Sequence, residues 1–519
     1  MNKVPDYQTA NSLLSRAEKV GQLFMPAAFI NDSEAEIEQL EHLIRTKGIG
    51  SLCFFHSRAS AATNYEGKKE VVFNDASFET LKKLIERYQN ASKYPLLIAI
   101  DAEWGLAMRI ENTPQYPYAL TLGAIQGNND LIFQVGKNIA KDCKAAGIHW
   151  NLAPCVDVNS NPNNPVIGYR SFGADKLKVA EKALAFIKGT ASEGILTSIK
   201  HFPGHGDTAT DSHLGLPLVE KPRTELTANE LYPFQQIIDK GVDSVMVGHL
   251  SVPSLANGET TSSSISPAII KDLLRNDMGY QGVVISDALN MHAVSKEYSE
   301  KGQLEWLAFD AGNDVLCFAE NVSEGITTIL QKASSEQIEE SFKRVWALKE
   351  KAIERDVSKT PRLTEPKQLN QTLAERSLTL LWGSESAIAQ FRATDFCTLT
   401  LKRSASQPKL QDLPSEIRQM RSQVAEETDI LVLLTPPQVK PANRFGFIKD
   451  EIDFINELIQ TKNVVVYLFG NPYMLQHISY EKATAVVVVY QDFTEFQDAA
   501  TEHFLGKLAA EGKLPVSIF

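Results

Sequence analysis

Apolar and polar positions follow two different periods along the first two thirds of the chain. Short runs of apolar and β-branched residues, typical of strands, are separated by longer stretches with the 3.6-residue period of amphipathic helices. The eight strand-like runs are 21–29, 48–55, 95–100, 148–154, 196–200, 242–247, 282–286 and 314–318. Eight strands interleaved with helices predict an α/β fold, a (β/α)8 TIM-like barrel, over residues 1–355.

The segments between these runs include 33–46 and 266–276, and the second opens with Ser266-Pro267, a good cap followed by a good first helical residue. Residues 356–371 are polar and lack a period, so they predict a linker. Beyond it, strand-like runs at 378–382, 430–435, 464–469 and 485–490 alternate with helical stretches at 450–460 and 496–508. Residues 372–519 are therefore expected to form a smaller α/β sandwich domain, with a structural or partner-facing role.

Polar side chains stand where the strand-like runs of the barrel end. They are Asp101, Glu103, Asp157, His201, His249 and Asp287. Barrel enzymes build their active sites at the carboxyl ends of the strands, so these scattered residues are expected to meet at one mouth.

The loop after the fifth run is unusually rich in titratable groups. It reads Lys-His-Phe-Pro-Gly-His-Gly-Asp-Thr from Lys200 and continues to Asp211-Ser212-His213. Asp211 and His213 are two residues apart, so in an extended loop the carboxylate could hold the imidazole while its other nitrogen exchanges protons. A hydrogen bond that only stabilises the loop is the alternative.

Three further features of the barrel each have two interpretations. Asp287 follows a strongly apolar run and could be a nucleophile held by a rigid strand, or the N-cap of the next helix. Arg170, in a loop with Pro and Gly, could bind hydroxyl groups or form a salt bridge at the rim. His201, His205 and Asp207 could hold zinc, although the intervening Pro203-Gly204 disfavours a helical ligand arrangement.

Composition narrows the function classes. The net charge of -12 disfavours a nucleic-acid partner. The five cysteines are widely spaced without a C-x-x-C pair, which fits a reducing compartment. The N-terminus is polar, and the longest apolar run, 483–490, is too short to span a bilayer. A cytoplasmic protein is expected, or a periplasmic one if a signal has been removed.

Several motifs together resemble glycoside hydrolase family 3, in its β-N-acetylglucosaminidase branch. They are 200–208, Asp211-Ser212-His213, 164–173, Asn151-Leu152-Ala153-Pro154 and 286–291. The resemblance covers the expected barrel in order. It implies retaining hydrolysis of terminal β-linked N-acetylglucosamine, from peptidoglycan fragments or chito-oligosaccharides, without a cofactor or metal.

The resemblance also assigns roles to individual residues. It makes Asp287 the nucleophile and His213 the acid/base, with Asp211 as the partner of that histidine. Sugar-binding roles fall on Asp101, Arg109, Arg170, Lys200 and His201, and we add His249 because it ends a strand-like run at the same mouth. A histidine acid is neutral after giving up its proton, so phosphate could compete with water as the acceptor.

Two positions depart from the family's pattern. The usual Asp-Gln-Glu-Gly-Gly reads Asp101-Ala102-Glu103-Trp104-Gly105, and Ala288 replaces the second acid often found after the nucleophile. Both departures concern the leaving-group preference, since Trp104 adds a stacking surface. The alternatives are a family 3 β-glucosidase or β-xylosidase, a metal-dependent barrel hydrolase, and an idle sugar-binding paralogue.

Overall fold

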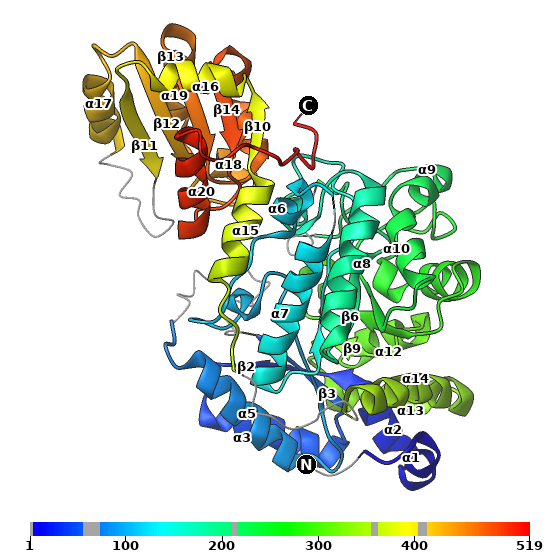
Figure 1. The fold of residues 1–519 in the computed structure, drawn as a ribbon. Coiled ribbons are helices and arrows are strands. Elements are labelled where there is room, and N and C mark those ends of the chain that lie inside the picture. Colours follow the sequence, from blue (N-terminus) through cyan, green and yellow to red (C-terminus); the bar gives the residue numbers. More distant parts are fainter. Residues whose placement is uncertain are drawn as a thin grey trace. The chain divides into compact units, whose positions relative to one another are not determined.

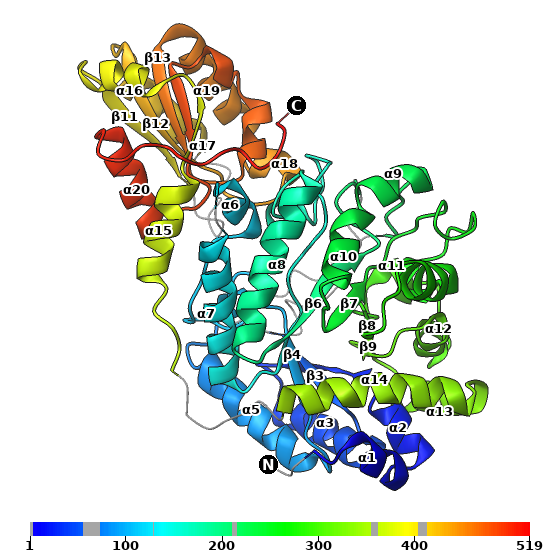
Figure 2. The ribbon, with the colours of Figure 1, turned by 45° about the vertical axis from the view of Figure 1, so that its right-hand side comes forward.

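The computed structural model describes residues 4–55, 73–127, 129–209, 215–353, 362–402 and 413–518 (Figures 1 and 2). They divide into two compact units. The first contains residues 1–116, 132–158 and 179–365, and the second contains 117–131, 159–178 and 366–519.

The first unit is a parallel β-barrel. Its strands are β1 (Phe24–Met25), β2 (Ala27–Phe29), β3 (Ser51–Phe55), β4 (Leu97–Ile100), β5 (Trp150–Asn151), β6 (Leu196–Phe202), β7 (Ser244–Val247), β8 (Val283–Ser286) and β9 (Leu316–Cys317). Strands β2 to β8 pair in chain order, and β9 pairs with β1. A parallel bridge between Ile285 and Val315 joins β8 to the start of β9 and closes the ring. Each of the eight predicted runs contains a strand, so the predicted barrel is confirmed.

Helices flank the barrel strands. They are α1 (Tyr7–Leu13), α2 (Arg16–Gly21), α3 (Glu34–Lys47), α5 (Ser77–Ala91), η1 (Leu106–Met108), α7 (Asp130–Ala146), α8 (Lys176–Ser192), α9 (Arg223–Ala228), α10 (Leu231–Ile238), η3 (Ser263–Ile265), η4 (Ala268–Asp277), α11 (His292–Ser295), α12 (Gln303–Ala311), α13 (Val322–Lys332) and α14 (Ser335–Ile353). Helices α7 and α8 lie side by side in both views. A Cβ atom at Gly136 or Gly189 would overlap a backbone carbonyl of the other helix, so these glycines permit the close approach.

Local sequence signals explain one helix start and misplace another. Helix α3 begins with a capping box, in which Ser33 accepts from the Glu36 N–H and Glu36 accepts from the Ser33 N–H. The segment expected to be capped by Ser266 is instead the π-helix η4, whose N-cap residue is Pro267 and makes no side-chain cap. Its Met278 N–H reaches the Leu273 carbonyl, one residue further back than in an α-helix.

The second unit is an α/β sandwich around a five-stranded sheet of order β10-β14-β13-β12-β11. Its strands are β10 (Thr379–Trp382), β11 (Cys397–Lys402), β12 (Asp429–Thr435), β13 (Asn463–Leu468) and β14 (Ala485–Val488), and only β10 is antiparallel to its neighbour. Its helical segments are α6 (Ala119–Ala124), η2 (Gly168–Arg170), α15 (Lys367–Ser377), α16 (Glu385–Arg392), α17 (Leu413–Gln423), α18 (Ala442–Phe445), α19 (Lys449–Thr461), η5 (Pro472–His477), η6 (Tyr480–Lys482) and α20 (Thr494–Phe504).

Two segments from the expected barrel sequence belong to this second unit, a division that differs from the single boundary expected at 356–371. Gly123 and Gly173 approach Pro515 so closely that a Cβ atom on either would contact it. The Ala174 N–H donates to the Pro515 carbonyl at 3.0 Å. These contacts link positions more than 300 residues apart. In the part of the chain that the structure describes, no helix is both long and apolar enough to cross a bilayer.

Candidate active site

Two acidic and two basic side chains form a cluster at the ends of two barrel strands. Asp101 follows β4, and Lys200 lies near the end of β6 with a side chain only 2% exposed. The Lys200 Nζ donates to Asp101 Oδ1 at 2.8 Å and lies 2.7 Å from Glu103 Oε1. Arg109 donates to the other Asp101 oxygen at 2.8 Å, and its guanidinium lies 5.0 Å from the centre of the Phe55 ring. Three predicted sugar-binding residues, Asp101, Arg109 and Lys200, are therefore in direct contact.

This cluster keeps Asp101 ionised. Burial raises the pKa of the Asp101 carboxyl, but the charges and hydrogen bonds of Lys200 and Arg109 outweigh it and hold the pKa well below its usual range. An ionised carboxylate accepts hydrogen bonds from sugar hydroxyls, and the two cations fix its position.

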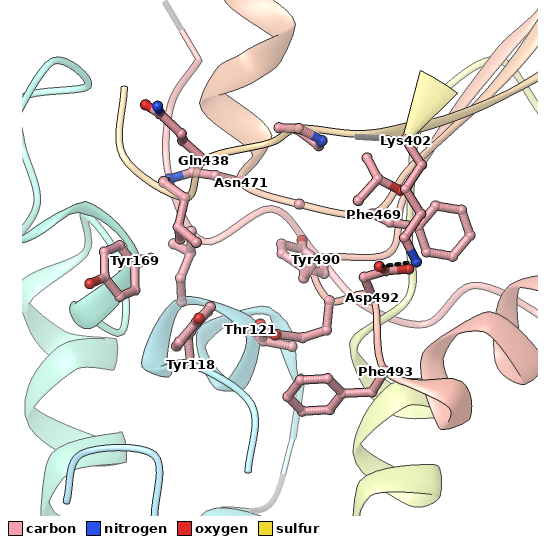
Figure 3. A pocket seen from close by; sticks show the side chains of 16 residues that line it. Tyr118, Thr121, Tyr169, Lys402, Gln438, Phe469, Asn471, Tyr490, Asp492 and Phe493 are labelled. Carbon is pink, nitrogen blue, oxygen red and sulfur yellow. Dashed lines mark hydrogen bonds and ion pairs between the residues drawn. The ribbon is translucent and has the colours of Figure 1, made fainter. Parts of the chain in front are cut away.

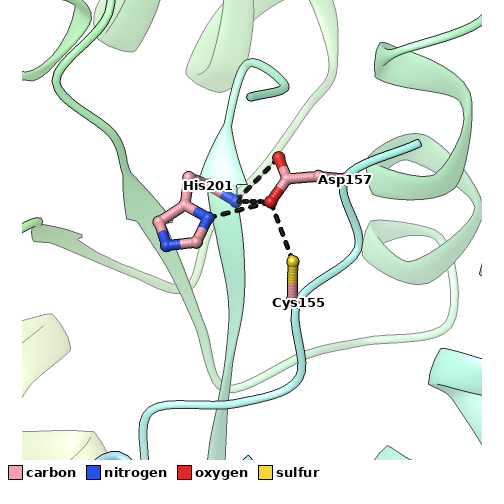
Figure 4. Close-up of side chains that lie close together, drawn as sticks. All are labelled: Cys155, Asp157 and His201. Carbon is pink, nitrogen blue, oxygen red and sulfur yellow. Dashed lines mark hydrogen bonds and ion pairs between the residues drawn. The ribbon is translucent and has the colours of Figure 1, made fainter. Parts of the chain in front are cut away.

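In a second cluster, Asp157 is hydrogen-bonded to both His201 and Cys155 (Figure 4). Asp157 is fully buried, and its Oδ2 accepts from His201 Nδ1 at 2.8 Å and from the Cys155 thiol at 2.9 Å. Its Oδ1 accepts from the backbone N–H of His205 at 2.7 Å. Burial raises the pKa of Asp157, but His201 and the hydrogen bonds lower it well below its usual range. The carboxylate therefore fixes the proton of His201 on Nδ1 and sets the orientation of the ring.

Asp287 is the first residue after β8 and is partly exposed. Its backbone N–H donates to the Val247 carbonyl at 2.9 Å, and its Oδ1 accepts from the N–H of Ala288 at 2.8 Å. The following helix, α11, has Met291 as its N-cap residue. The N-cap interpretation of Asp287 is therefore wrong, and the strand end presents the carboxylate.

His249 lies just behind this strand end. It is fully buried, with Nε2 2.9 Å from the Ala288 carbonyl oxygen and Nδ1 2.7 Å from the Ser264 hydroxyl. Because a carbonyl oxygen only accepts, Nε2 carries the proton. His249 thus holds the backbone next to Asp287.

The surroundings of Asp287 lower the pKa of its carboxyl. Burial raises its pKa, but nearby His249 and His201, the hydrogen bond from Ala288 and the charge of Lys200 together lower it. A carboxylate that is ionised, partly exposed and fixed to a strand end can attack an electrophilic carbon.

The remaining predicted residues are Asp211, His213 and Arg170. Asp211 and His213 lie outside the described residues. Arg170 ends η2 in the second unit, and its backbone N–H donates to the Ile167 carbonyl at 2.6 Å.

The zinc alternative on His201, His205 and Asp207 finds little support. Asp207 forms an ion pair with Lys221 at 3.0 Å, and His205 Nδ1 lies 2.6 Å from the Thr208 hydroxyl. A different set, Cys155, Asp157 and His201, has ligand atoms within 4.8 Å of one another. Those atoms are already hydrogen-bonded to each other and hold His201 in place.

Two residues of the site were noticed in the sequence without a role. Glu103 and Asp157 both follow predicted strands, yet neither was assigned a function. The sequence carries one signal for Glu103, its position two residues beyond Asp101; its pairing with buried Lys200 appears only in the structure. The contact of Cys155 with Asp157 depends on the tertiary structure.

Comparison with known proteins identifies the family of the chain. A model described as "Glycosyl hydrolase family 3 N terminal domain" matches residues 16–348. Beta-hexosaminidase A of Pseudoalteromonas piscicida is 35% identical over 292 residues, which are 53% of this chain but only 47% of that protein. A beta-hexosaminidase of Nitrosomonas eutropha is 29% identical over 320 residues, covering 60% of this chain and 85% of that protein.

One of the solved structures similar to this chain carries a descriptive name. It is a glycoside hydrolase family 3 beta-N-acetylglucosaminidase from Paenibacillus sp. str. FPU-7, which superposes with a TM-score of 0.79 at 26% identity. The superposition covers 97% of this chain and 99% of that one.

Proposed function

Because the chain belongs to glycosyl hydrolase family 3, we propose that it is a retaining β-N-acetylglucosaminidase with Asp287 as the nucleophile. The relatives named beta-hexosaminidase and the beta-N-acetylglucosaminidase structure support a glycosidase that releases N-acetylglucosamine. Peptidoglycan fragments and chito-oligosaccharides are the substrates of this class that we consider. The observation that carries the proposal is an ionised Asp287 at the end of β8, held among His249, His201 and Lys200.

In the proposed reaction, the Asp287 carboxylate attacks the anomeric carbon and displaces the glycosidic oxygen, which receives a proton from an acid. The acid, which has now lost its proton, then acts as a base. It removes a proton from water, and the resulting hydroxide releases the sugar from Asp287. Asp101, Arg109 and Lys200 would hold hydroxyl groups of the sugar, and His201 would contact it through Nε2. We assign the acid/base role to His213 with Asp211 as its partner, and we add Arg170 to the sugar-binding residues.

The nucleophile is tested by Asp287→Ala. Turnover should fall on the order of 10⁴-fold or more. The fold should survive, because the described contacts of the side chain include only one hydrogen bond, to the neighbouring Ala288 N–H. Steady-state kinetics with an aryl β-N-acetylglucosaminide, together with a thermal melt, would check both expectations. A variant that keeps a near wild-type rate would place the nucleophile elsewhere.

The acid/base assignment needs two substrates that differ in leaving group. His213→Ala should slow a poor leaving group by roughly 10²–10⁴-fold, and a good leaving group much less in the first step. With the good leaving group a covalent adduct on Asp287 should accumulate, visible by mass spectrometry of the intact protein. Equal slowing of both substrates without an adduct would favour the β-glucosidase alternative, in which the second unit supplies a carboxylic acid.

Substrate class and metal dependence can be read from one panel. Aryl β-N-acetylglucosaminides should be hydrolysed faster than the matching β-glucosides and β-xylosides, with the same rates in EDTA. Activity that EDTA abolishes and zinc restores would instead support the metal-dependent hydrolase.

A further inference from the structure

The second unit contains a cavity of about 360 Å³ that the catalytic assignment does not use (Figure 3). It lies at the carboxyl ends of the four parallel strands, because its wall includes Lys402 and Thr435, the last residues of β11 and β12, and Phe469 and Tyr490, which follow β13 and β14. Every residue that lines it belongs to the second unit. In open α/β sheets, ligands bind outside the carboxyl ends of the strands.

Aromatic rings form much of this cavity. Tyr118 and Tyr169 meet at an angle of 64°, with ring centroids 4.8 Å apart, and form a corner on one side. Phe469, Tyr490 and Phe493 also line the cavity. Small-molecule sites typically combine such rings with a few polar groups that fix orientation. A pyranose ring suits this wall, because its C–H faces are apolar and stack on aromatic rings while its hydroxyls point outward.

The wall of this cavity carries hydrogen-bonding groups but no net charge. The two charged lining residues, Lys402 and Asp492, neutralise each other in an ion pair at 2.6 Å. Across the described ranges of the chain, the side-chain amide of Gln438 and the Thr435 hydroxyl make no hydrogen bond to protein, so both are available to a ligand. A neutral wall with amide, hydroxyl and ion-paired groups disfavours phosphate or another anion and favours an uncharged polyol.

The cavity also continues along the sheet. A second cavity of about 380 Å³ shares Lys402, Thr435, Phe469 and Asp492 with the first and runs over β11 and β12. The first cavity has room for about one or two sugar rings, by comparison with ordinary ligand pockets. The continuation gives space for further rings of a chain.

Part of the wall is held in a backbone conformation that bulky residues rarely adopt. Tyr490 has a φ of 70°, and its hydroxyl lies 2.8 Å from the Thr379 hydroxyl. Its neighbour Gln491 is buried and donates to the Thr121 hydroxyl at 2.9 Å. Such strain persists only where surrounding contacts impose it, and it is concentrated at ligand sites. The loop after β14 is therefore fixed in shape before any ligand arrives.

We propose that this cavity of the second unit binds a β-linked pyranose oligosaccharide by stacking on its aromatic wall. It is a non-catalytic sugar site, since the described residues that line it include no nucleophile with an acid partner. The proposal stands on the second unit alone; only the choice of Asp287→Ala for its test rests on the proposed catalytic role.

Hydrogen–deuterium exchange of the full chain with Asp287→Ala tests it, because that variant leaves an added sugar intact. The probes are di-N-acetylchitobiose and cellobiose. Peptides covering 433–441 and 489–495 should exchange more slowly when sugar is added. Peptides covering 98–110 and 197–206 report on the barrel in the same sample, so binding at the two places is measured separately.

Three substitutions, each added to Asp287→Ala, sharpen the result. Phe493→Ala removes one ring and should weaken pocket protection about tenfold in apparent affinity. Gln438→Trp fills the cavity from an exposed position and should abolish the protection. Trp382→Ala is the matched control, because this half-exposed aromatic of the same unit does not line the cavity. Its loss should leave the protection of the cavity peptides unchanged.

The outcomes separate cleanly. Protection by di-N-acetylchitobiose alone supports a site for N-acetylated glycans, and protection by both sugars supports a general β-linked pyranose site. No pocket protection at concentrations that protect the barrel peptides would overturn the proposal, as would equal protection in Gln438→Trp. Pocket protection without barrel protection would uphold the sugar site while counting against the catalytic proposal.

Discussion

Replacing Lys200 by methionine removes one charge from the four-charge cluster while keeping most of the side-chain volume. The Lys200 Nζ lies 2.8 Å from Asp101 and 2.7 Å from Glu103, in a side chain that is 2% exposed. Asp101 keeps its second partner, Arg109, at 2.8 Å. Glu103, with a side chain 6% exposed, loses its salt bridge to Lys200.

The size of the effect follows from these distances. At an effective dielectric constant of about 20, opposite charges 2.8 Å apart attract by about 6 kcal/mol, and dehydration of the charges offsets most of that. Removing one partner of a buried ion pair destabilises proteins by about 3–5 kcal/mol, because the other charge stays buried. We expect Lys200→Met to lower the free energy of unfolding by that amount. It should also raise the pKa of Asp287, since Lys200 is one of the groups that lower it.

Arg344→Met is the matched control. Arg344 donates to Asp314 at 3.0 Å, Asp314 is fully buried, and it too keeps a second arginine, Arg275. Asp314 precedes β9 and so lies at the amino end of the strands, away from the expected catalytic face. The control should lose stability without a change in KM.

Urea unfolding and pH–rate profiles of kcat/KM would measure both variants. Lys200→Met should lower kcat/KM and shift the acidic limb to higher pH, because the nucleophile must be deprotonated. An unchanged profile with unchanged KM would refute the placement of Lys200 in the sugar site. Unchanged stability in both variants would refute the estimate for buried pairs.

Two further predictions concern buried groups. Asp157→Asn should raise KM and lower kcat, because His201 loses the carboxylate that positions it. The free energy of unfolding should fall by about 1.5–3 kcal/mol. Wild-type kinetics in this variant would rule out the positioning role of Asp157. Burial lowers the pKa of Lys349 from 10.5 to about 7, so the folded state is penalised wherever this lysine is charged, and stability is regained as pH rises from about 7 towards 10.5. Lys349→Met should therefore raise the urea midpoint most at or below pH 7, and a gain that does not shrink by pH 10 would contradict this reasoning.

The barrel was predictable because its strands are buried on both faces and read as continuous apolar runs. Strand β11 was missed for the opposite reason. It lies at the edge of its sheet and alternates exposed Thr398 and Thr400 with buried Leu399 and Leu401, a weaker signal in a stretch of six residues. The cap expected at Ser266 is wrong, because the helix there is a π-helix whose N-cap residue is Pro267.

The candidate site was predictable at the level of strand ends. Asp101, His201, His249 and Asp287 all follow apolar runs, and the fold alone gathers such positions. The partners were not predictable, because the contact of Cys155 with Asp157 and that of His249 with Ser264 and the Ala288 carbonyl depend on loop conformations. The roles of Asp211 and His213 stay predictions.

The second unit is not a contiguous piece of the gene. Leu120 and Ala124 from α6 share its core with Val486 and Val516, and the Asn159 amide donates to the Tyr473 hydroxyl at 2.7 Å. A fragment starting at residue 366 would lack these parts, and a fragment ending there would leave them uncovered in water. A single recombination event at the linker would therefore not separate the two units into complete domains. We expect the two units to be inherited together and to unfold together.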